Sequence, residues 1–391
     1  MLNRAIFVAS ESAMAHRPGG VQRCTREYMA VLREAGFDLT EVTFQFDQRW
    51  RAKVLRRLSN RPYANMIPEA CVDNIVRASK THTISTMFLN FGDVVELAPR
   101  LKHLLPETRL VLLSYGLESV DYIHTIRSQR LSSPFAGMGR YEELRLARQL
   151  IAECNQRLVI DDVVCLSAFE AEIERWLGAS RVTWIPRTVT YQPIAWNPIQ
   201  NRAGFVGTLD HPPNREGLIL VLRALQDLKT DIQVQVVGGP TQAGARLERE
   251  YDCVTYLGRL SDEALRKEAE SWGCFLHPVF CYARGASTKL AVGLEWGLPI
   301  VTTPPGCRGY RWSRGSLVVA ESPGDYARAM AALLGAESRM KEAYEEVRQV
   351  AQTSPSVASV AEDLRAFLLG AAPDRIESIA SHEETIISTS S

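Results

Sequence analysis

The chain has 391 residues, 46% of them hydrophobic, and its 45 basic residues balance 45 acidic ones. This length is enough for two domains with separate buried cores. A formal net charge of zero argues against a nucleic-acid partner, because proteins that bind nucleic acids generally carry a basic surface. The eight cysteines lack the spacing of a zinc site, and no apolar run reaches the ~18 residues of a membrane span. Without a secretory signal, we expect a cytoplasmic location.

Short apolar runs alternate with longer helical patterns along the chain. The predicted strands are Ala5–Ala9, Leu39–Phe44, Ile84–Leu89, Leu110–Leu113, Asp162–Leu166, Val182–Ile185, Ala203–Val206, Gln233–Val237, Cys274–His277, Pro299–Thr302 and Leu317–Val319. The predicted helices are Val21–Ala35, Glu142–Gln156, Ala168–Leu177, Glu216–Leu228, Asp262–Glu270 and Tyr326–Leu334. Several strands are apolar throughout, which is typical of parallel strands covered on both faces. The alternation therefore predicts an α/β fold with doubly wound sheets.

The alternating pattern starts again after a proline-rich stretch. Residues 186–198 contain Pro186, Pro193 and Pro198 and have no helical period, so they are interpreted as a linker. We predict an N-terminal domain over 1–185, a C-terminal domain over 186–371 and a flexible tail over 372–391. Two such domains facing one another form a cleft at the carboxyl ends of their strands, where ligands bind.

The strongest chemical signal lies in Ala283–Gly309, with the sequence ARGASTKLAVGLEWGLPIVTTPPGCRG. A small-residue loop over 285–288 enters a helix near Lys289, and the helix ends at Gly297. The free N–H groups at such a helix start suit a diphosphate. A cation in the first turn opposes the helix dipole, so a phosphate ligand would explain Lys289, with Arg284 as a second charge. The alternative is that Lys289 is an ordinary solvated lysine.

A second glycine loop follows the first predicted strand. Gly19 and Gly20 precede the helix that starts at Val21, and paired glycines let backbone N–H groups approach an anion. The alternative is an ordinary loop before a helix.

These residues resemble the donor-binding segment of GT-B glycosyltransferases, especially the family 4-like group, also called glycosyl transferases group 1. In that group a glycine-rich loop, a lysine and a helix ending in Gly-Leu-Pro recur. Other segments resemble the group in the same order, namely Gly19–Gly36, Val164–Phe169, Ile185–Val189, Phe205–Asp210, Pro212–Gly217, Val236–Gly239 and Tyr256–Asp262. The last of these corresponds to a strand followed by a helix cap. The resemblance covers most of the chain from residue 5 to about 335.

The resemblance implies two Rossmann-like domains and a nucleoside diphosphate sugar as the donor substrate. It implies transfer to an acceptor hydroxyl with retention of anomeric configuration, and no bound metal or cofactor. The acceptor is expected to be a glycan, a lipid-linked sugar or a small molecule. The predicted donor-binding residues are Gly19, Gly20, Gly207, Thr208, Asp210, Asn214, Gly238, Arg259, Arg284, Gly285, Ser287, Thr288, Lys289 and Glu295.

Some positions depart from the group's pattern. Val292 replaces a glutamate that contacts the donor ribose, and Glu295 lies three residues further along the helix. Thr208 and Pro213 stand where many members have an arginine and a lysine. These departures leave two alternatives open, an inactive GT-B partner protein and a GT-B-fold sugar-nucleotide epimerase. A dehydrogenase is not favoured, because no GxGxxG follows the first strand.

The predicted acceptor side lies in the N-terminal domain after the strand Leu110–Leu113. Glu118, Asp121 and His124 follow that strand end and are the candidate catalytic residues, able to orient a hydroxyl or act as a base. The alternative is a polar helix start, because acidic residues favour first turns.

A basic segment, Arg49–Arg61, contains six basic residues and no acidic one. Trp50, Val54 and Leu58 are spaced as on one helix face. This segment is either a helix packed on its own domain, the interpretation we favour, or a peripheral contact with an anionic membrane.

Overall fold

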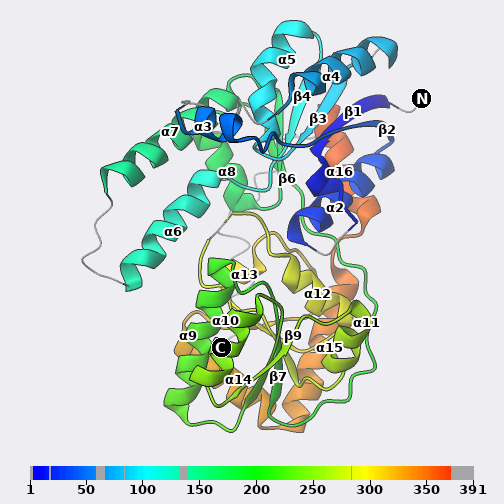
Figure 1. Ribbon diagram of the computed structural model, residues 1–391. Helices are drawn as coiled ribbons and strands as arrows, with labels where there is room; N and C mark the ends of the chain where they lie inside the picture. Colours follow the sequence, from blue (N-terminus) through cyan, green and yellow to red (C-terminus); the bar gives the residue numbers. More distant parts are fainter. Residues whose placement is uncertain are drawn as a thin grey trace. The chain divides into compact units, whose positions relative to one another are not determined.

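The computed structural model describes residues 3–16, 19–58, 67–82, 84–132, 139–282 and 284–370. The predicted tail, Arg61 and Ala283 lie outside these residues. The chain forms two compact units (Figure 1). Of the described residues, the first unit holds 3–186, 284–286 and 357–370, and the second holds 187–282 and 287–356. The predicted linker over 186–198 contains no helix or strand, and the division between the units falls at its start.

The first unit contains a six-stranded sheet in which all strands are parallel. Its strands are β1 (Asn3–Ser10), β2 (Phe37–Phe44), β3 (Thr86–Asn90), β4 (Arg109–Leu113), β5 (Asp162–Cys165) and β6 (Val182–Trp184). Their order is β2-β1-β3-β4-β5-β6, so the direction of winding reverses between β1 and β3.

Helices cover both faces of the first sheet. They are α1 (Glu11–Met14), α2 (Gly20–Glu34), α3 (Trp50–Leu58), α4 (Glu69–His82), α5 (Ala98–Leu104), α6 (Glu118–Ser132), α7 (Arg140–Arg157), α8 (Ala168–Trp176) and α16 (Val357–Leu368), with a 3₁₀ helix, η1 (Val94–Leu97), before α5. Successive strand residues point to opposite faces. Ile6 and Val8 accordingly join a core beneath α4 and α5, and Phe7 joins the core beneath α2 and α16.

The helix α16 corrects the predicted domain limits, which placed it in the C-terminal domain. It packs beside α2 in the first unit, as the orange and blue helices of Figure 1 show. Val360 and Leu364 are fully buried there. The guanidinium of Arg181 donates to the carbonyl of Phe367 at 2.9 Å, so cations also cap the carboxyl end of α16. The linker indicates where the chain leaves the first unit, but it cannot show that a later helix, α16, returns to that unit.

The second unit repeats the plan with another six-stranded parallel sheet. Its strands are β7 (Arg202–Val206), β8 (Gln233–Val237), β9 (Val254–Gly258), β10 (Cys274–Leu276), β11 (Ile300–Thr302) and β12 (Val318–Val319). The order β12-β11-β10-β7-β8-β9 reverses between β7 and β10. In such doubly wound sheets this reversal point, at the carboxyl ends of the strands, is where ligands bind.

Helices again cover both faces of the sheet. They are α9 (Pro212–Leu228), α10 (Thr241–Glu250), α11 (Asp262–Ala269), α12 (Thr288–Trp296), α13 (Pro304–Cys307), α14 (Pro323–Leu334) and α15 (Glu337–Thr353). Leu276 of β10 packs into the core beneath α9 and α14. Phe275, the residue before it, packs on the other face beneath α12 and α15.

Every predicted strand overlaps an observed one, and β9 lies where the family resemblance placed a strand. Each predicted helix is also present. The helices α4, α5, α10, α15 and α16 were not predicted.

Residues 50–58 of the basic segment form α3, but their packing differs from the expectation. The exposed fractions of Trp50 and Val54 are 69% and 42%, whereas Ala52 is buried. The favoured interpretation, in which Trp50 and Val54 pack on the domain, is therefore wrong for these two side chains. Among the described residues no helix is long and apolar enough to cross a membrane.

Candidate functional site

The candidate donor site lies where the winding of the second sheet reverses. Gly207 follows β7, and Gly238 follows β8. The N–H of Gly207 donates to the carbonyl of Val237 at 2.9 Å, and the N–H of Gly238 donates to that of Gly258 at 2.8 Å. Hydrogen bonds of the ladder thus continue past the strands and hold the glycine turns side by side.

Close approach requires glycine at Gly238 and leaves little room for a side chain at Gly207. A Cβ on Gly207 would lie 2.8 Å from Cε of Lys289, and one on Gly238 would lie 1.9 Å from the carbonyl oxygen of Gly207. Gly238 also has φ of +145°, a conformation that side chains other than glycine rarely adopt. The bare backbone is what lets the lysine stem cross the end of β7.

Lys289 of α12 is the central charged group of this site. Its ammonium donates to Oδ1 of Asn214, a buried residue of α9 whose Nδ2 donates to the carbonyl of Thr208 at 3.0 Å. Among the described residues this amide is the only hydrogen-bonding partner of the ammonium, and no carboxylate pairs with it. Burial lowers the pKa of Lys289 to about 8, because the charged form is poorly solvated there.

The start of α12 is held from two directions. Ser287 is the N-cap, and its hydroxyl oxygen accepts from the N–H of Lys289 at 3.4 Å. The hydroxyl of Tyr310 donates to the carbonyl of Ser287 and accepts from the N–H of Ala291 at 2.9 Å. The helix ends at Gly297, with φ of +69°, where the sequence predicted its end. The first turn is thus fixed with its amide groups at the carboxyl end of the sheet.

Sequence reasoning missed His277, which follows β10 and is fully buried. One ring nitrogen, Nε2, lies 2.7 Å from Oγ of Ser287, and the other, Nδ1, lies 2.9 Å from Oγ1 of Thr302. Burial, with the nearby charge of Lys289, lowers its pKa to about 3, so the ring is neutral. A histidine at the carboxyl end of a predicted strand, directly before Pro278, was the available signal.

The remaining candidates of the second unit lie in the turns after two strands or at other positions of α12. Asp210 and Arg259 are exposed, in the turns after β7 and β9. Thr288 is the first residue of α12. Glu295 follows Lys289 by six residues, which places it ~240° around the helix. Its backbone carbonyl accepts from the N–H of Gln192 at 2.8 Å.

Arg284 and Gly285 group with the first unit, where carboxylates bind them. The guanidinium of Arg284 pairs with Glu118 and with Asp121, whose Oδ2 lies 3.1 Å from Nε. Asp121 also accepts from the backbone N–H of Arg284 at 2.9 Å. The N–H of Gly285 donates to Glu170 of α8. The structure therefore brings two predicted catalytic carboxylates together with a predicted donor-binding arginine, a contact that the sequence did not indicate.

The other first-unit candidates lie at the start of α2 and within α6. Gly19 is the N-cap of α2 and Gly20 its first residue, after β1 as predicted. His124 lies three residues beyond Asp121 on α6 and is partly buried. Tyr115, beyond β4, belongs to a closed buried cluster in which its hydroxyl lies 2.9 Å from Oδ1 of Asn90 and 3.1 Å from Oγ1 of Thr25. Its hydroxyl is thus used within the fold.

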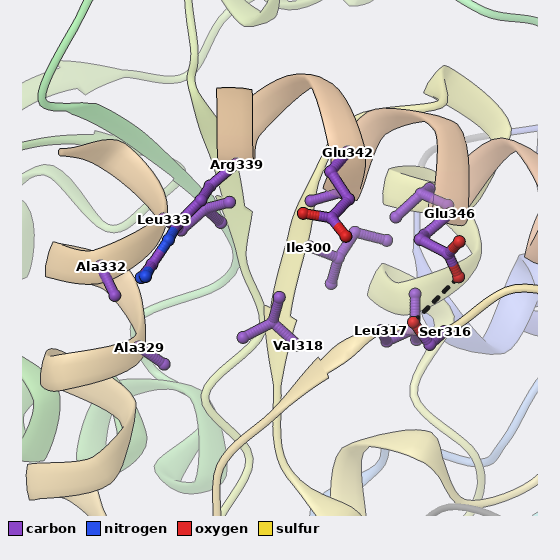
Figure 2. Close-up of a pocket in the computed structure, with 12 residues that line it drawn as sticks. Ile300, Ser316, Leu317, Val318, Ala329, Ala332, Leu333, Arg339, Glu342 and Glu346 are labelled. Atoms are coloured by element: carbon purple, nitrogen blue, oxygen red, sulfur yellow. Dashed lines mark hydrogen bonds between the residues drawn. The ribbon is translucent and has the colours of Figure 1, made fainter. Parts of the chain in front are cut away.

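A separate groove of about 530 Å³ lies between α14 and α15 at the sheet edge formed by β12. Figure 2 shows an apolar floor that includes Ile300 and Val318, with Arg339, Glu342 and Glu346 along its rim. Glu346 accepts a hydrogen bond from Ser316 at 3.0 Å. None of the candidate residues lines this groove, and Ile300 and Val318 are the first residues of their strands. It is therefore at the opposite end of these strands from the candidate donor site.

Comparison with known proteins finds a family similarity in the second unit. Residues 200–336 match the family of glycosyl transferases group 1. Among curated proteins, none matches the chain in sequence.

Several solved structures are similar over most of the chain. A glycosyltransferase from Rickettsia africae ESF-5 superposes with a TM-score of 0.57 at 11% identity, over 95% of this chain and 99% of that one. A mutant of the Thermobaculum terrenum O-GlcNAc transferase gives 0.53 at 16% identity, over 94% of this chain and 66% of that one. TarM superposes with a TM-score of 0.53 at 11% identity, over 81% of this chain and 57% of that one. This chain therefore spans less than two thirds of the latter two proteins.

At these identities the structural similarity concerns the fold. It confirms the predicted GT-B architecture, with two α/β units of parallel strands. The match over 200–336 confirms the resemblance of this part of the chain to group 1 glycosyltransferases.

Proposed function

We propose, from the group 1 glycosyltransferase domain over 200–336 and the GT-B fold, that this chain transfers a sugar from a nucleoside diphosphate sugar to an acceptor hydroxyl. One observation carries the proposal. Lys289 is half-buried at the reversal point of the second sheet, deep enough to lower the pKa of its ammonium, and that ammonium has a neutral amide as its hydrogen-bond partner. A buried cation without a carboxylate is unfavourable unless a ligand compensates it, and a diphosphate supplies that charge.

The chemistry of transfer requires stabilisation of the departing diphosphate. In this proposal Lys289 and the first-turn N–H groups of α12 provide it, since preorganised donors cost no reorganisation during reaction. The proposal assigns this role to the protein groups rather than to a metal ion. Retention of configuration is included because of the resemblance to the family 4-like group.

A diphosphate of uridine is the first donor nucleotide to test. One similar structure is a mutant of S. aureus TarM in complex with fondaparinux, alpha-GlcNAc-glycerol and UDP, matched with a TM-score of 0.52 at 11% identity. For our chain we propose a nucleotide sugar of this kind as donor and a glycan, a lipid-linked sugar or a small molecule as acceptor.

The acceptor hydroxyl is proposed to bind on the first unit near Glu118 and Asp121. Both carboxylates contact Arg284. A carboxylate can accept several hydrogen bonds, so either group could accept a proton from the hydroxyl while the guanidinium orients it. His124 is the third candidate base, on the same helix.

The inactive partner protein and the epimerase remain the competing interpretations. Val292, the position of the missing ribose ligand, packs against the apolar cluster beneath α12. Absence of nucleotide binding would favour the inactive partner protein. Conversion of a sugar nucleotide without an acceptor would favour the epimerase.

The helix α3 supports an additional proposal, namely peripheral contact with an anionic membrane. It exposes Trp50 and Val54, and Arg51 and Lys53 are exposed beside them. An exposed aromatic residue among cations is typical of a helix that lies at a lipid surface.

The central experiment measures thermal stabilisation of the protein by UDP, GDP, ADP, dTDP and CDP. A ligand that binds only the folded state raises the melting temperature. We expect stabilisation by one nucleotide class, and its loss in Lys289→Ala. The matched control is Lys341→Ala, which removes an exposed lysine of the same unit. Equal stabilisation of wild type and Lys289→Ala would contradict the proposed site, and no stabilisation by any of the five at millimolar concentration would favour the inactive partner.

A further inference from the structure

His277 is a fully buried residue whose ring and backbone both have partners. The ring joins Ser287, the N-cap of α12, to Thr302 at the end of β11. Its backbone N–H lies 2.9 Å from both the carbonyl of Val301 and the hydroxyl of Tyr326. The imidazole is thereby fixed between β10, β11 and the helix that carries Lys289.

The surroundings leave the imidazole little freedom. A Cβ on Gly306 would lie 2.9 Å from Nδ1 of His277 and 2.5 Å from Oγ1 of Thr302, so only glycine fits beside the pair. On the other side of the contact, Tyr310 holds the carbonyl of Ser287. Ser287 is thus fixed through its hydroxyl by His277 and through its carbonyl by Tyr310.

We propose that His277 is a positioning residue of the donor site, which through Nε2 holds Ser287 so that its hydroxyl and the first N–H groups of α12 bind the donor diphosphate. The inference rests on the proposed function and deepens it, because it adds a hydroxyl donor and the residue that orients it. His277 itself does not touch the substrate in this assignment.

A neutral imidazole can form both ring hydrogen bonds of His277, to Ser287 and to Thr302. A neutral imidazole has one donor and one acceptor nitrogen. With Nε2 protonated, the ring donates to Oγ of Ser287, and Nδ1 accepts from the hydroxyl of Thr302 at 2.9 Å, a shorter contact than the 3.4 Å from this hydroxyl to the carbonyl of His277. The Ser287 hydroxyl proton is then directed to a phosphate oxygen. Each donor in this chain polarises the next, which strengthens the final hydrogen bond to the anion.

A purely structural histidine would also have hydrogen-bond partners on both ring nitrogens. The experiment must therefore distinguish a structural role of His277 from the positioning of Ser287. Glutamine places an amide near the position of Nε2, whereas asparagine reaches only the position of Nδ1. We therefore compare His277→Gln, which keeps the contact with Ser287, with His277→Asn, which keeps the contact with Thr302. Ser287→Ala and the double variant with His277→Asn complete a cycle.

Two measurements apply to each variant, both at a temperature where all variants are folded. The first is amide hydrogen exchange over the start of α12 without ligand. The second is the affinity for whichever of UDP, GDP, ADP, dTDP and CDP binds the wild type most tightly. We expect His277→Asn to bind about tenfold more weakly, as for loss of a hydrogen bond to a charged group. It should also exchange faster at Lys289 and Leu290, with His277→Gln close to wild type in both.

In the double variant, Ser287→Ala should add no further loss of affinity, because His277 acts through Ser287. If His277→Asn lowers only the melting temperature and leaves exchange and affinity unchanged, His277 is a structural residue and the inference is overturned. A wild type that binds no diphosphate contradicts the proposed function instead. In that case the ligand-free exchange decides whether His277 positions Ser287 at all: faster exchange in His277→Asn alone supports it, and equal exchange overturns it.

Discussion

The amide oxygen of Asn214 accepts a hydrogen bond from the ammonium of Lys289, although the two residues lie 75 positions apart in sequence. They come from α9 and α12, the helices that follow the neighbouring strands β7 and β10. A neutral oxygen satisfies one N–H of the lysine and leaves its positive charge uncompensated. The pair therefore fixes where an anionic ligand would be held.

Asn214→Asp tests whether this uncompensated charge is needed. A carboxylate at this position would pair with Lys289 and raise the pKa of the ammonium. It would also compete with a phosphate for it, so we expect diphosphate affinity to fall by tenfold or more. Calorimetric titration measures the affinity. Thermal unfolding provides the control, since the substitution should not lower stability at neutral pH. Unchanged affinity would show that the ligand does not use Lys289.

The depressed pKa of Lys289 predicts a specific dependence of stability on alkaline pH. The folded-state value of about 8 lies below the ordinary value of 10.5, so between these pH values the unfolded chain binds more protons. Stability therefore increases with pH across this window, and the cost of burying the charge is fully present below pH 8. Urea unfolding of wild type and Lys289→Met at pH 7 and pH 10 measures this. The wild type should gain stability relative to the variant, by ~3 kcal/mol at most, and a constant difference would exclude the shift.

The glycine turn at the end of β8 predicts a large effect of a single methyl group. Gly238→Ala combines a positive φ with a Cβ 1.9 Å from the carbonyl oxygen of Gly207, so the backbone must move. We expect a loss of more than ~2 kcal/mol in the free energy of unfolding. Gly258→Ala is the matched control, because Gly258 also has positive φ but no atom within 4 Å of its added Cβ. Gly258→Ala should lower the free energy of unfolding by only ~1 kcal/mol. Equal losses would mean that the close approach to Gly207 has no cost.

The exposed face of α3 predicts binding to anionic vesicles. Trp50→Glu should weaken co-sedimentation with phosphatidylglycerol vesicles, because it removes apolar area and adds a repelled charge. Phosphatidylcholine vesicles should bind neither protein. Trp176→Glu is the control, since Trp176 is 74% exposed on α8, outside the basic segment. If both substitutions have the same effect, α3 has no special role at the lipid surface.

The sequence predicted the alternation of strands and helices and the loop that places Lys289 at a helix start, because these depend on local periodicity and on glycine positions. It did not predict the partners of Arg284. Glu118 and Asp121 lie more than 160 positions away, and only the packed fold brings them to the arginine. Arg284 was predicted to bind a phosphate because of its positive charge. The carboxylates that compete for it could not be identified from the sequence.

His277 was missed for a related reason. Its partners, Ser287 and Thr302, are 10 and 25 positions away, with no fixed spacing that would signal a network. Its place at the end of a buried strand was consistent with an ordinary core residue. Trp50 and Val54 illustrate the opposite case, because a helical period indicates which side chains share a face but not whether anything covers that face.

The packing of α16 in the first unit has a consequence for how the protein is made. Val360 and Leu364 complete the apolar layer that contains Tyr28 and Leu32, more than 320 residues earlier in the chain. During synthesis the amino-terminal strands and helices emerge long before the helix that covers one face of their sheet. Domains generally fold in the order in which they are synthesised. Here the second unit is complete at residue 356, so it is ready to fold before the first unit has received its last helix.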